Sequence, residues 1–343
     1  MKRLSIFTLS FLALAGLAFA QATPGWVADL EKAFPSRDWV AVSASGTNQN
    51  IAENSAMNGL ARAFKTDVAS LSQASQQFTQ LVSEAAGKKT VAFDQSQNFA
   101  QEVNTSTNVR GLIGVQTDLF RAKDGTVYVN ARMKRDECAA RYSGMIRENE
   151  VIINQLLNLA NPLPVGFEKY AALSFAHGIA QVTDNFQNIL EVLDPRASSR
   201  KPGYGGANAI KVRMQACANG ITVGIAVSTE VRQETTRIAR AFTSFFKDRG
   251  FKTNEQGSGL YILRADVSFQ DTPFERVQST RYYFDASLED RKGNSVFGFT
   301  EEERKSHLMA REARILALGA VEASIKEAAF AKEFDAWLGS LVD

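Results

Sequence analysis

The sequence predicts an α+β protein in which two small αβ domains, built on antiparallel sheets with packed helices, are separated by a long helical hairpin. Segments before residue 135 and after residue 218 alternate short apolar strands with amphipathic helices. The segment between them shows only helical periodicity. This order of elements is typical of helices packed on antiparallel sheets. The predicted divisions are a signal peptide at 1–20, an αβ domain at 21–134, a helical hairpin at 135–196, a linker at 197–218 and a second αβ domain at 219–343.

The first 20 residues have the pattern of an export signal. Lys2 and Arg3 precede an apolar run, and Ala18-Phe19-Ala20 has the small-x-small pattern of a signal-peptidase site before Gln21. A membrane anchor is the competing interpretation, but about 15 apolar residues are fewer than the roughly 20 that span a bilayer. We therefore expect export, with no transmembrane segment in the mature chain. Lipid attachment at Gln21 is not expected, because no cysteine lies near it.

Overall charge argues against a nucleic-acid partner. The chain has 39 basic and 37 acidic residues, which gives a formal net charge of +2. We find no run of five like charges that would indicate a nucleic-acid arm or an acidic tail.

The chain has two cysteines, Cys138 and Cys217, which permit one intramolecular disulfide after export. Closing a loop of about 80 residues would stabilise the fold by roughly 4 kcal/mol in the chain-entropy model. Two buried free thiols are the alternative, since cysteine is among the most buried residue types. The sequence leaves both alternatives open.

The first αβ domain begins with a strand at 38–45, whose valines share one face. Gly46 ends the strand, and Asn50 with Glu53 approximates a capping box. In the helix that follows, small and apolar residues recur at three- and four-residue spacing: Ala52, Ala56, Leu60, Ala63 and Phe64.

The rest of this domain contains one ambiguous element and one clear hairpin. Residues 68–87 fit either a helix or an extended strand, and 94–106 is helical in pattern. Two alternating apolar runs between 109 and 133 are joined by Lys123-Asp124-Gly125, a strong turn signal because glycine accepts positive φ.

Two long helices are predicted at 135–159 and 167–193, each ended by a proline at 162 or 195. The glycine-, serine- and proline-rich stretch at 197–209 is the best linker candidate.

The C-terminal domain starts with a continuous apolar strand at 221–227, followed by a helix at about 230–249 that stops at Gly250. Strands at 259–270, 279–290 and 294–302 come next. A final helix from about Met309 has a predicted buried stripe: Ile315, Leu318, Val321, Ile325, Phe330, Phe334, Trp337 and Leu341.

Residues 24–134 resemble the lipoprotein-20-like domain of bacterial cell-envelope proteins. The lead-in Pro24-Gly25-Trp26, the strand DWVAVSASG and the helix ending LARAFKTDVAS carry the first half of this resemblance. The closing hairpin carries the second half, at Gly111, Asp118, Phe120, Asp124, Gly125 and Tyr128. The lipid-bearing cysteine that is frequent in the family is missing, and the helical hairpin extends beyond the family's domain.

Residues 219–343 are similar, more loosely and in topology only, to αβ domains of the flagellar FlgT family and the curli-secretion CsgG family. Together the resemblances imply a non-catalytic component of the envelope or of a surface organelle. A resemblance of fold cannot by itself establish that function.

We find no catalytic or metal-binding constellation in the sequence, and we expect no cofactor and no enzyme activity. Neither His177 nor His307 has a second ligand at metal-binding spacing. Ser244 and Lys247 match the S-x-x-K spacing, but an ordinary amphipathic helix explains them better. A linker is likewise the favoured interpretation for Gly203, Gly205 and Gly206, ahead of a phosphate-binding loop.

The leading hypothesis is an exported scaffold or assembly protein of the periplasm or outer membrane. Its partners would be envelope proteins or further copies of itself, and a link to flagellar or surface-organelle assembly follows from the resemblance. One alternative is a small-ligand binding protein, with Trp39 and Tyr128 lining a pocket between the first sheet and the hairpin. Another is an undetected hydrolase with a dispersed site, for which Ser244 and His307 are the only candidate residues that we can name.

Overall fold

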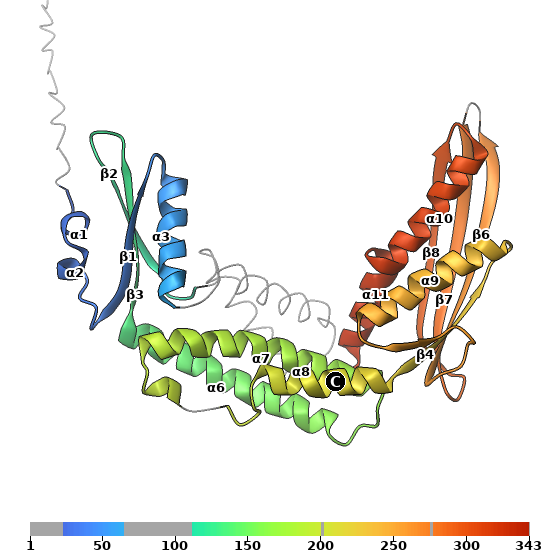
Figure 1. Ribbon diagram of the computed structural model, residues 1–343, viewed down its shortest axis with the longest axis horizontal. Coiled ribbons are helices and arrows are strands. Elements are labelled where there is room, and N and C mark those ends of the chain that lie inside the picture. Colours follow the sequence, from blue (N-terminus) through green and yellow to red (C-terminus); the bar gives the residue numbers. More distant parts are fainter. Residues whose placement is uncertain (1–22, 65–111, 200–201, 275–276, 343) are drawn as a thin grey trace, which may run out of the picture.

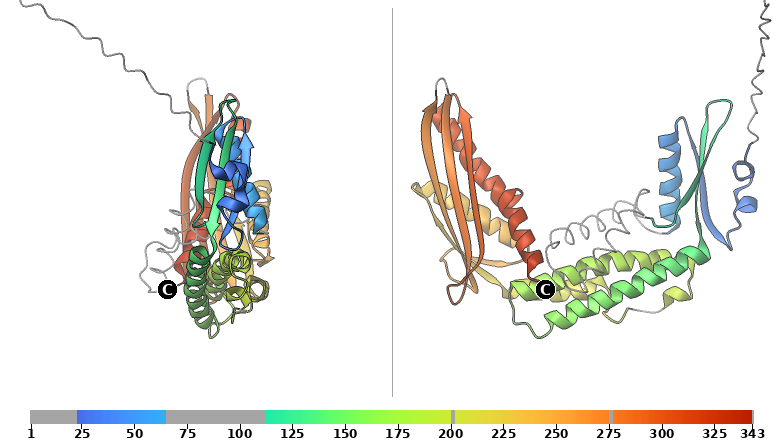
Figure 2. Two further views of the ribbon diagram at one scale, coloured as in Figure 1. Left: turned by 90° about the vertical axis from the view of Figure 1, so that its left-hand side faces the viewer. Right: turned by 180° about the vertical axis from the view of Figure 1, so that it is seen from behind.

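The computed structural model describes residues 23–64, 112–199, 202–274 and 277–342, and it shows an α+β protein. Two αβ units rise from opposite ends of a layer of long helices, so the described chain has the outline of a U (Figure 1). The view from behind, on the right of Figure 2, shows the same arrangement. The predicted elements at 68–87 and 94–106, the predicted signal peptide and Gly111 lie outside the described residues.

The N-terminal unit is a three-stranded antiparallel sheet of order β1-β3-β2, with α3 packed against it. Its elements are α1 (Gly25–Ala28), α2 (Leu30–Ala33), β1 (Trp39–Gly46), α3 (Gln49–Ala63), β2 (Gln116–Arg121) and β3 (Val127–Lys134). The predicted hairpin is confirmed, and Gly125 has φ 87° at its turn.

The small-residue helix forms as predicted, but its start differs. Asn48 is the N-cap, because its side-chain oxygen accepts a hydrogen bond from the Ile51 amide at 3.0 Å. The capping box at Asn50 is therefore wrong, and Glu53 accepts from the Gln49 side chain instead. Ala52, Ala56, Leu60 and Phe64 are buried, whereas Ala63 is exposed.

The central layer consists of α6 (Arg135–Ala160), α7 (Phe167–Leu193) and α8 (Ala207–Gly220). The first two confirm the predicted helical hairpin. The third begins within the predicted linker at 197–218 and ends two residues beyond it, and the predicted linker also holds a short 3-10 helix at Ala197–Ser199. Buried Ile210 and Cys217 belong to α8, which packs on α7.

The C-terminal unit has a five-stranded sheet of order β5-β4-β6-β7-β8. The strands are β4 (Thr222–Ser228), β5 (Lys252–Asn254), β6 (Tyr261–Phe274), β7 (Val277–Asp290) and β8 (Ser295–His307). The strands from β6 to β8 are antiparallel, as predicted, but β4 runs parallel to both of its neighbours, so the sheet is mixed. Strand β5 was not predicted from the sequence.

Helices α9 (Arg232–Asp248), α10 (Ala310–Lys326) and α11 (Ala329–Ser340) pack against this sheet. The final helix was predicted as continuous, but it breaks between Lys326 and Ala329. At the break, the Phe330 amide donates to the Ser324 hydroxyl at 3.2 Å. Most of the predicted stripe packs inward, but Ile315 is 42% exposed because α10 turns Ala313 and Ala317 toward the core instead.

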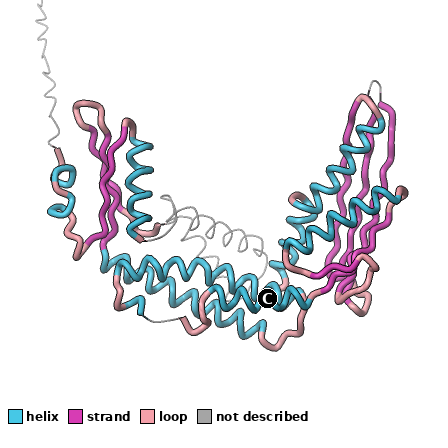
Figure 3. The backbone as a smooth tube through the Cα atoms, in the orientation of Figure 1, coloured by secondary structure: helices cyan, strands magenta, loops and turns pink. Residues whose placement is uncertain are grey.

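The units join the helical layer without long connections. Strand β3 ends at Lys134 and α6 begins at Arg135, while only Ile221 separates α8 from β4. Figure 3 shows both transitions between strand and helix colours.

Aromatic packing fixes the joint with the C-terminal unit. Phe167, the first residue of α7, is almost fully buried, and its ring centroid lies 4.5 Å from that of Tyr261 and 5.2 Å from that of Phe251. It also packs edge-on against Phe334 and Trp337 of α11. The start of the α7 helix is therefore part of the C-terminal core.

Polar contacts fix the opposite joint. The Arg135 guanidinium donates to the backbone oxygens of Ser36 and Leu193 at 2.8 and 3.3 Å, linking the lead-in to the end of α7. The buried Tyr142 hydroxyl accepts from the Ile113 amide at 2.9 Å.

Candidate interaction surface

The C-terminal sheet has one covered face and one open face. Along β6, Leu263, Ala265 and Val267 are buried beneath the helices, whereas the alternate residues Arg264 and Asp266 are exposed. Helices α9, α10 and α11 lie together on the covered side in Figures 1 and 2. The other face carries a shallow groove of about 630 Å³ across β4, β6, β7 and β8.

Two neighbouring rows of side chains line this groove, and the strand register aligns each row across four strands. The outer row is Ser228, Asp266, Asp285 and Thr300, and the inner row is Ala226, Arg264, Ser287 and Gly298. The inner row is hollow because three of its four members have small side chains or none.

Asp266 and Asp285 are the chemically distinctive pair in the groove. They stand directly opposite one another on antiparallel strands, and both are exposed. Like charges at such positions repel and destabilise a sheet. Within the described ranges, neither carboxylate forms a hydrogen bond or an ion pair. The pair is therefore suited to a cationic group supplied by a binding partner.

Arg264 does not neutralise this pair in the structure. Its Nε atom donates to Glu289 Oε2 at 2.9 Å, at the margin of the groove away from the carboxylates. The centre of the groove is thus acidic, and its one flanking cation is already paired.

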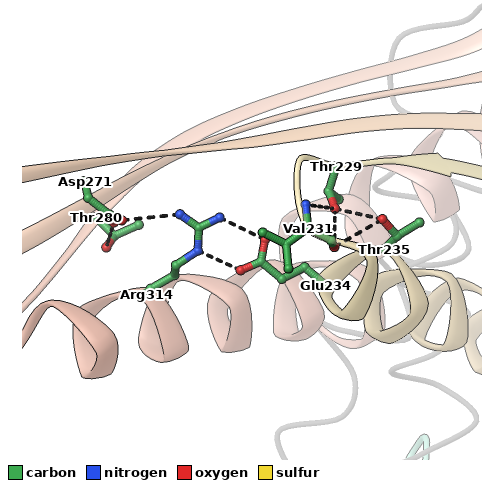
Figure 4. A network of polar contacts seen from close by, with 7 residues as sticks. All are labelled: Thr229, Val231, Glu234, Thr235, Asp271, Thr280 and Arg314. Carbon is green, nitrogen blue, oxygen red and sulfur yellow. Dashed lines mark hydrogen bonds and ion pairs between the residues drawn. The ribbon is translucent and has the colours of Figure 1, made fainter.

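The covered side of the sheet holds a polar network that positions the helices, shown in Figure 4. Arg314 of α10 donates to both carboxylate oxygens of Glu234 at 2.7 and 3.0 Å and to Asp271 at 3.3 Å. The Thr280 hydroxyl donates to the same Asp271 at 2.6 Å. Hydrogen bonding to Glu234 raises the pKa of Arg314 above its ordinary value. The network therefore ties α9 and α10 to β6 and β7.

A second polar cluster lies further along the covered face. The buried Tyr282 hydroxyl lies 3.0 Å from carboxylate oxygens of both Glu301 and Glu303, and Ser324 of α10 donates to Glu301. Burial and the two carboxylates raise the pKa of Tyr282, so it stays protonated and donates. These polar residues are therefore accounted for by hydrogen bonds between the sheet and α10.

The two cysteines are buried free thiols in this structure and do not form the disulfide considered from the sequence. Cys138 Sγ lies 3.7 Å from the Gly114 oxygen, and Cys217 Sγ lies 3.8 Å from the Gly166 oxygen. Gly166 precedes the start of α7, whereas the start of α6 lies beside its end. The 27 residues of α7 rise roughly 40 Å, far beyond the reach of a disulfide. Burial raises the pKa of both thiols.

Neither histidine belongs to a metal site in the described part of the chain. His177 is half-buried on α7, and burial together with nearby Lys211 lowers its pKa. His307 ends β8, where its Nδ1 accepts a hydrogen bond from the Met309 amide at 3.3 Å.

The structure does not bring Ser244 and His307 together. Ser244 donates to Asp248 at 3.2 Å and precedes Phe245, which packs on Phe334. Phe297 of β8 packs on the same Phe334 ring, and His307 lies ten residues further along the strand, about 30 Å away. Ser244 and His307 therefore do not belong to one site.

The S-x-x-K match occupies an amphipathic helix, as the sequence interpretation favoured. Phe245 and Phe246 between Ser244 and Lys247 are buried in the core, and Lys247 is exposed.

The glycine cluster precedes α8, but its helix end is already occupied. Asp184 Oδ2 accepts a hydrogen bond from the Ala207 amide at 2.9 Å, which places a carboxylate at the helix N-terminus. Burial raises the pKa of Asp184. Gly205 and Gly206 have φ 82° and 83°, so they form a turn into the helix. Among the described residues, the elements before them are α7 and the 3-10 helix Ala197–Ser199, not the strand that a phosphate loop would require.

Trp39 and Tyr128 do not line one pocket. In the register of β1 and β3, Trp39 pairs with Lys134 and Ser45 pairs with Tyr128, which separates the two aromatic residues by about 20 Å. Trp39 packs against Phe34 at 5.6 Å, and Arg132 lies over both rings. The two aromatic residues therefore cannot line one pocket together.

Sequence reasoning did not single out Asp266 and Asp285. The alternation of β6 and β7 places each aspartate on the polar face of its strand. Only the strand register, which the pattern does not specify, shows that they stand opposite one another.

Comparisons with known proteins give no family. No family model matches the chain, and no curated protein matches it. Among solved structures, the lipoprotein GNA1162 from Neisseria meningitidis aligns with a TM-score of 0.23 and 10% identity, covering 29% of this chain and 94% of that chain. The secreted protein HP1454 from Helicobacter pylori aligns with a TM-score of 0.35 and 12% identity, covering 87% of this chain and 97% of that chain. At these scores, neither similarity carries an argument about function.

No helix in the described ranges combines the length and the apolar character that crossing a bilayer requires.

Proposed function

We propose that the chain is an exported, non-catalytic scaffold of the bacterial cell envelope, which binds a partner protein through the open face of its C-terminal sheet. The unpaired carboxylates Asp266 and Asp285 in the groove are the observation that carries the proposal. The partner segment would present lysine or arginine side chains, since these offset the repulsion between the two carboxylates.

The architecture supports a scaffold. Strand-to-helix transitions at Lys134–Arg135 and around Ile221 connect each αβ unit directly to the helical layer. The 26 residues of α6 extend about 39 Å, which sets the spacing between the units. A rigid spacer of this kind can hold two binding partners at a fixed separation.

Export is proposed from the N-terminal pattern. Cleavage after Ala20 would deliver the mature chain to the periplasm, or to the periplasmic side of the outer membrane. A role in flagellar or surface-organelle assembly is the finer form of this proposal, and it rests on the resemblances of residues 24–134 and 219–343.

The test combines fractionation with crosslinking in cells. We expect a mature N-terminus at Gln21, an envelope location, and crosslinks to an envelope protein that weaken in the D266N/D285N variant. The E148Q/E191Q variant is the matched control, because it removes two exposed carboxylates from the helical layer. A cytoplasmic location, or equal crosslinking in the two variants, would contradict the proposal.

Binding of a small cationic ligand is the second candidate function. The groove volume lies within the range of about 300–1,000 Å³ that is usual for ligand sites. A polyamine such as spermidine would then raise the melting temperature of the protein, and the increase would disappear in D266N/D285N. A flat screen of cationic ligands would count against this candidate.

A further inference from the structure

Helix α10 has an apolar outward face that the rest of the described chain leaves uncovered. Ala313, Ala317 and Val321 face the core, and Arg314 anchors the helix through Glu234. On the other side, Ile315 and Leu316 are 42% and 47% exposed. A helix that is apolar on both its inner and outer faces normally packs against a further partner.

The outward face of α10 carries apolar residues, among them Gly319 and Ala323, at its centre and charged side chains at its ends. Leu316, Gly319 and Ala323 recur at three- and four-residue spacing and therefore share one side of the helix. A Cβ atom built at Gly319 would meet nothing within 4 Å, so the backbone there is open to close approach by another helix.

The charges on this face are arranged symmetrically about Gly319. Glu312 lies seven residues before it and Lys326 seven residues after it, so both lie within about 20° of the direction of Gly319. Lys326 is exposed and Glu312 half-buried. In the part of the chain that the structure describes, neither forms an ion pair.

We propose that this face of α10 is the contact surface of a two-fold symmetric dimer, in which α10 packs antiparallel against α10 of a second copy. A two-fold axis at Gly319 creates two equivalent ion pairs, each between Glu312 of one copy and Lys326 of the other. Leu316 then packs against Ala323 of the second copy, and the two helices cross where their Gly319 backbones meet. An interface of this kind is self-complementary, as a two-fold axis requires.

The charge order selects the antiparallel arrangement. A parallel pair of helices would bring Glu312 against Glu312 and Lys326 against Lys326, and both contacts are repulsive. An unrelated partner would need the same acid-to-base order in reverse, which a second inverted copy supplies without further assumptions. One helix pair buries less than the roughly 1,600 Å² of a standard interface, so we expect a weak dimer.

This interface is separate from the proposed groove. The α10 contact lies over the covered face of the C-terminal sheet, whereas Asp266 and Asp285 lie on the opposite face. The dimer and the partner-binding groove can therefore be tested separately. The D266N/D285N variant should weaken partner binding and leave the dimer unchanged.

Sedimentation equilibrium of charge-reversal variants tests the inference. Each single reversal, E312K or K326E, creates two repulsive pairs across the axis and should weaken the dimer by about tenfold or more. The double variant E312K/K326E restores opposite charges and should recover the wild-type dissociation constant. Recovery by the double variant is specific to a two-fold contact between these residues.

A substitution at the crossing gives an independent measurement. G319L has free space for its side chain within one copy, and removing glycine from a helix favours folding. The variant should keep the circular dichroism spectrum and melting temperature of a folded protein while losing the dimer. A wild-type protein that stays monomeric at millimolar concentration, or a double reversal that fails to recover the dimer, would overturn the inference.

Discussion

At the scale of single residues, Asp266 and Asp285 illustrate how the proposed binding surface opposes stability. Their carboxylates stand opposite one another on β6 and β7, and within the described residues neither is paired with a basic side chain. We expect D266N/D285N to raise the melting temperature by about 1–3 °C, since a repulsive cross-strand pair is removed. Differential scanning calorimetry against E148Q/E191Q checks this, and a lower melting temperature in D266N/D285N would show that the carboxylates support the fold.

His177 gives the fold a dependence on pH. Its pKa in the folded chain is lower than the ordinary value of 6.5, because burial and nearby Lys211 disfavour the charged form. The unfolded chain therefore binds more protons below neutrality, and the stability present above pH 6.5 is lost as pH falls toward the folded-state pKa.

Urea unfolding of the wild type and of H177Q between pH 7.5 and 5 measures this effect. The wild type should lose more stability than H177Q over the interval, because glutamine does not titrate. Parallel curves for the two proteins would show that the histidine is not responsible.

At the scale of elements, Phe167 couples the helical layer to the C-terminal unit. Its ring fills a site between Phe251, Tyr261, Phe334 and Trp337. We expect F167A to cost about 3–5 kcal/mol, as is usual for deleting a buried aromatic ring.

Calorimetry should also show the consequence for cooperativity. Without Phe167, the C-terminal unit and the helical layer should unfold in two separate transitions, whereas F167L should keep one transition with a smaller loss. A single transition in F167A with an unchanged midpoint would show that the joint does not depend on this ring.

The elements also show where sequence patterns succeed. Helices α6 and α7 were predictable because long apolar periodicities end at prolines 162 and 195. Helix α8 was missed because Gly203, Gly205 and Gly206 suggested a linker, although they form only the turn that precedes it. The break between α10 and α11 was also missed, because the apolar residues keep a helical spacing on both sides of it.

At the scale of the whole molecule, composition and pattern predicted the α+β class and the order of sheets and hairpin. They could not predict the open groove, because it depends on the register of four strands. The distance between the cysteines likewise follows from the length and packing of α7, which places them at opposite ends of the helical layer.

The proposed scaffold role assigns a different task to each of three parts of the molecule. In the proposed arrangement, the helical layer holds the two αβ units apart, the open sheet face binds a cationic segment of a partner, and α10 on the other side contacts a second copy. The residues to be substituted lie outside the buried core: Asp266, Asp285, Glu312 and Lys326.

Site-specific photocrosslinking in cells tests the central claim most directly. A photoreactive residue at Ser287, in the inner row of the groove, should crosslink to a lysine- or arginine-bearing segment of an envelope protein. The same probe at exposed Glu148 should not. The account predicts that the Ser287 crosslink is lost in D266N/D285N. A Ser287 crosslink that persists in that variant, or none above the Glu148 background, would contradict it.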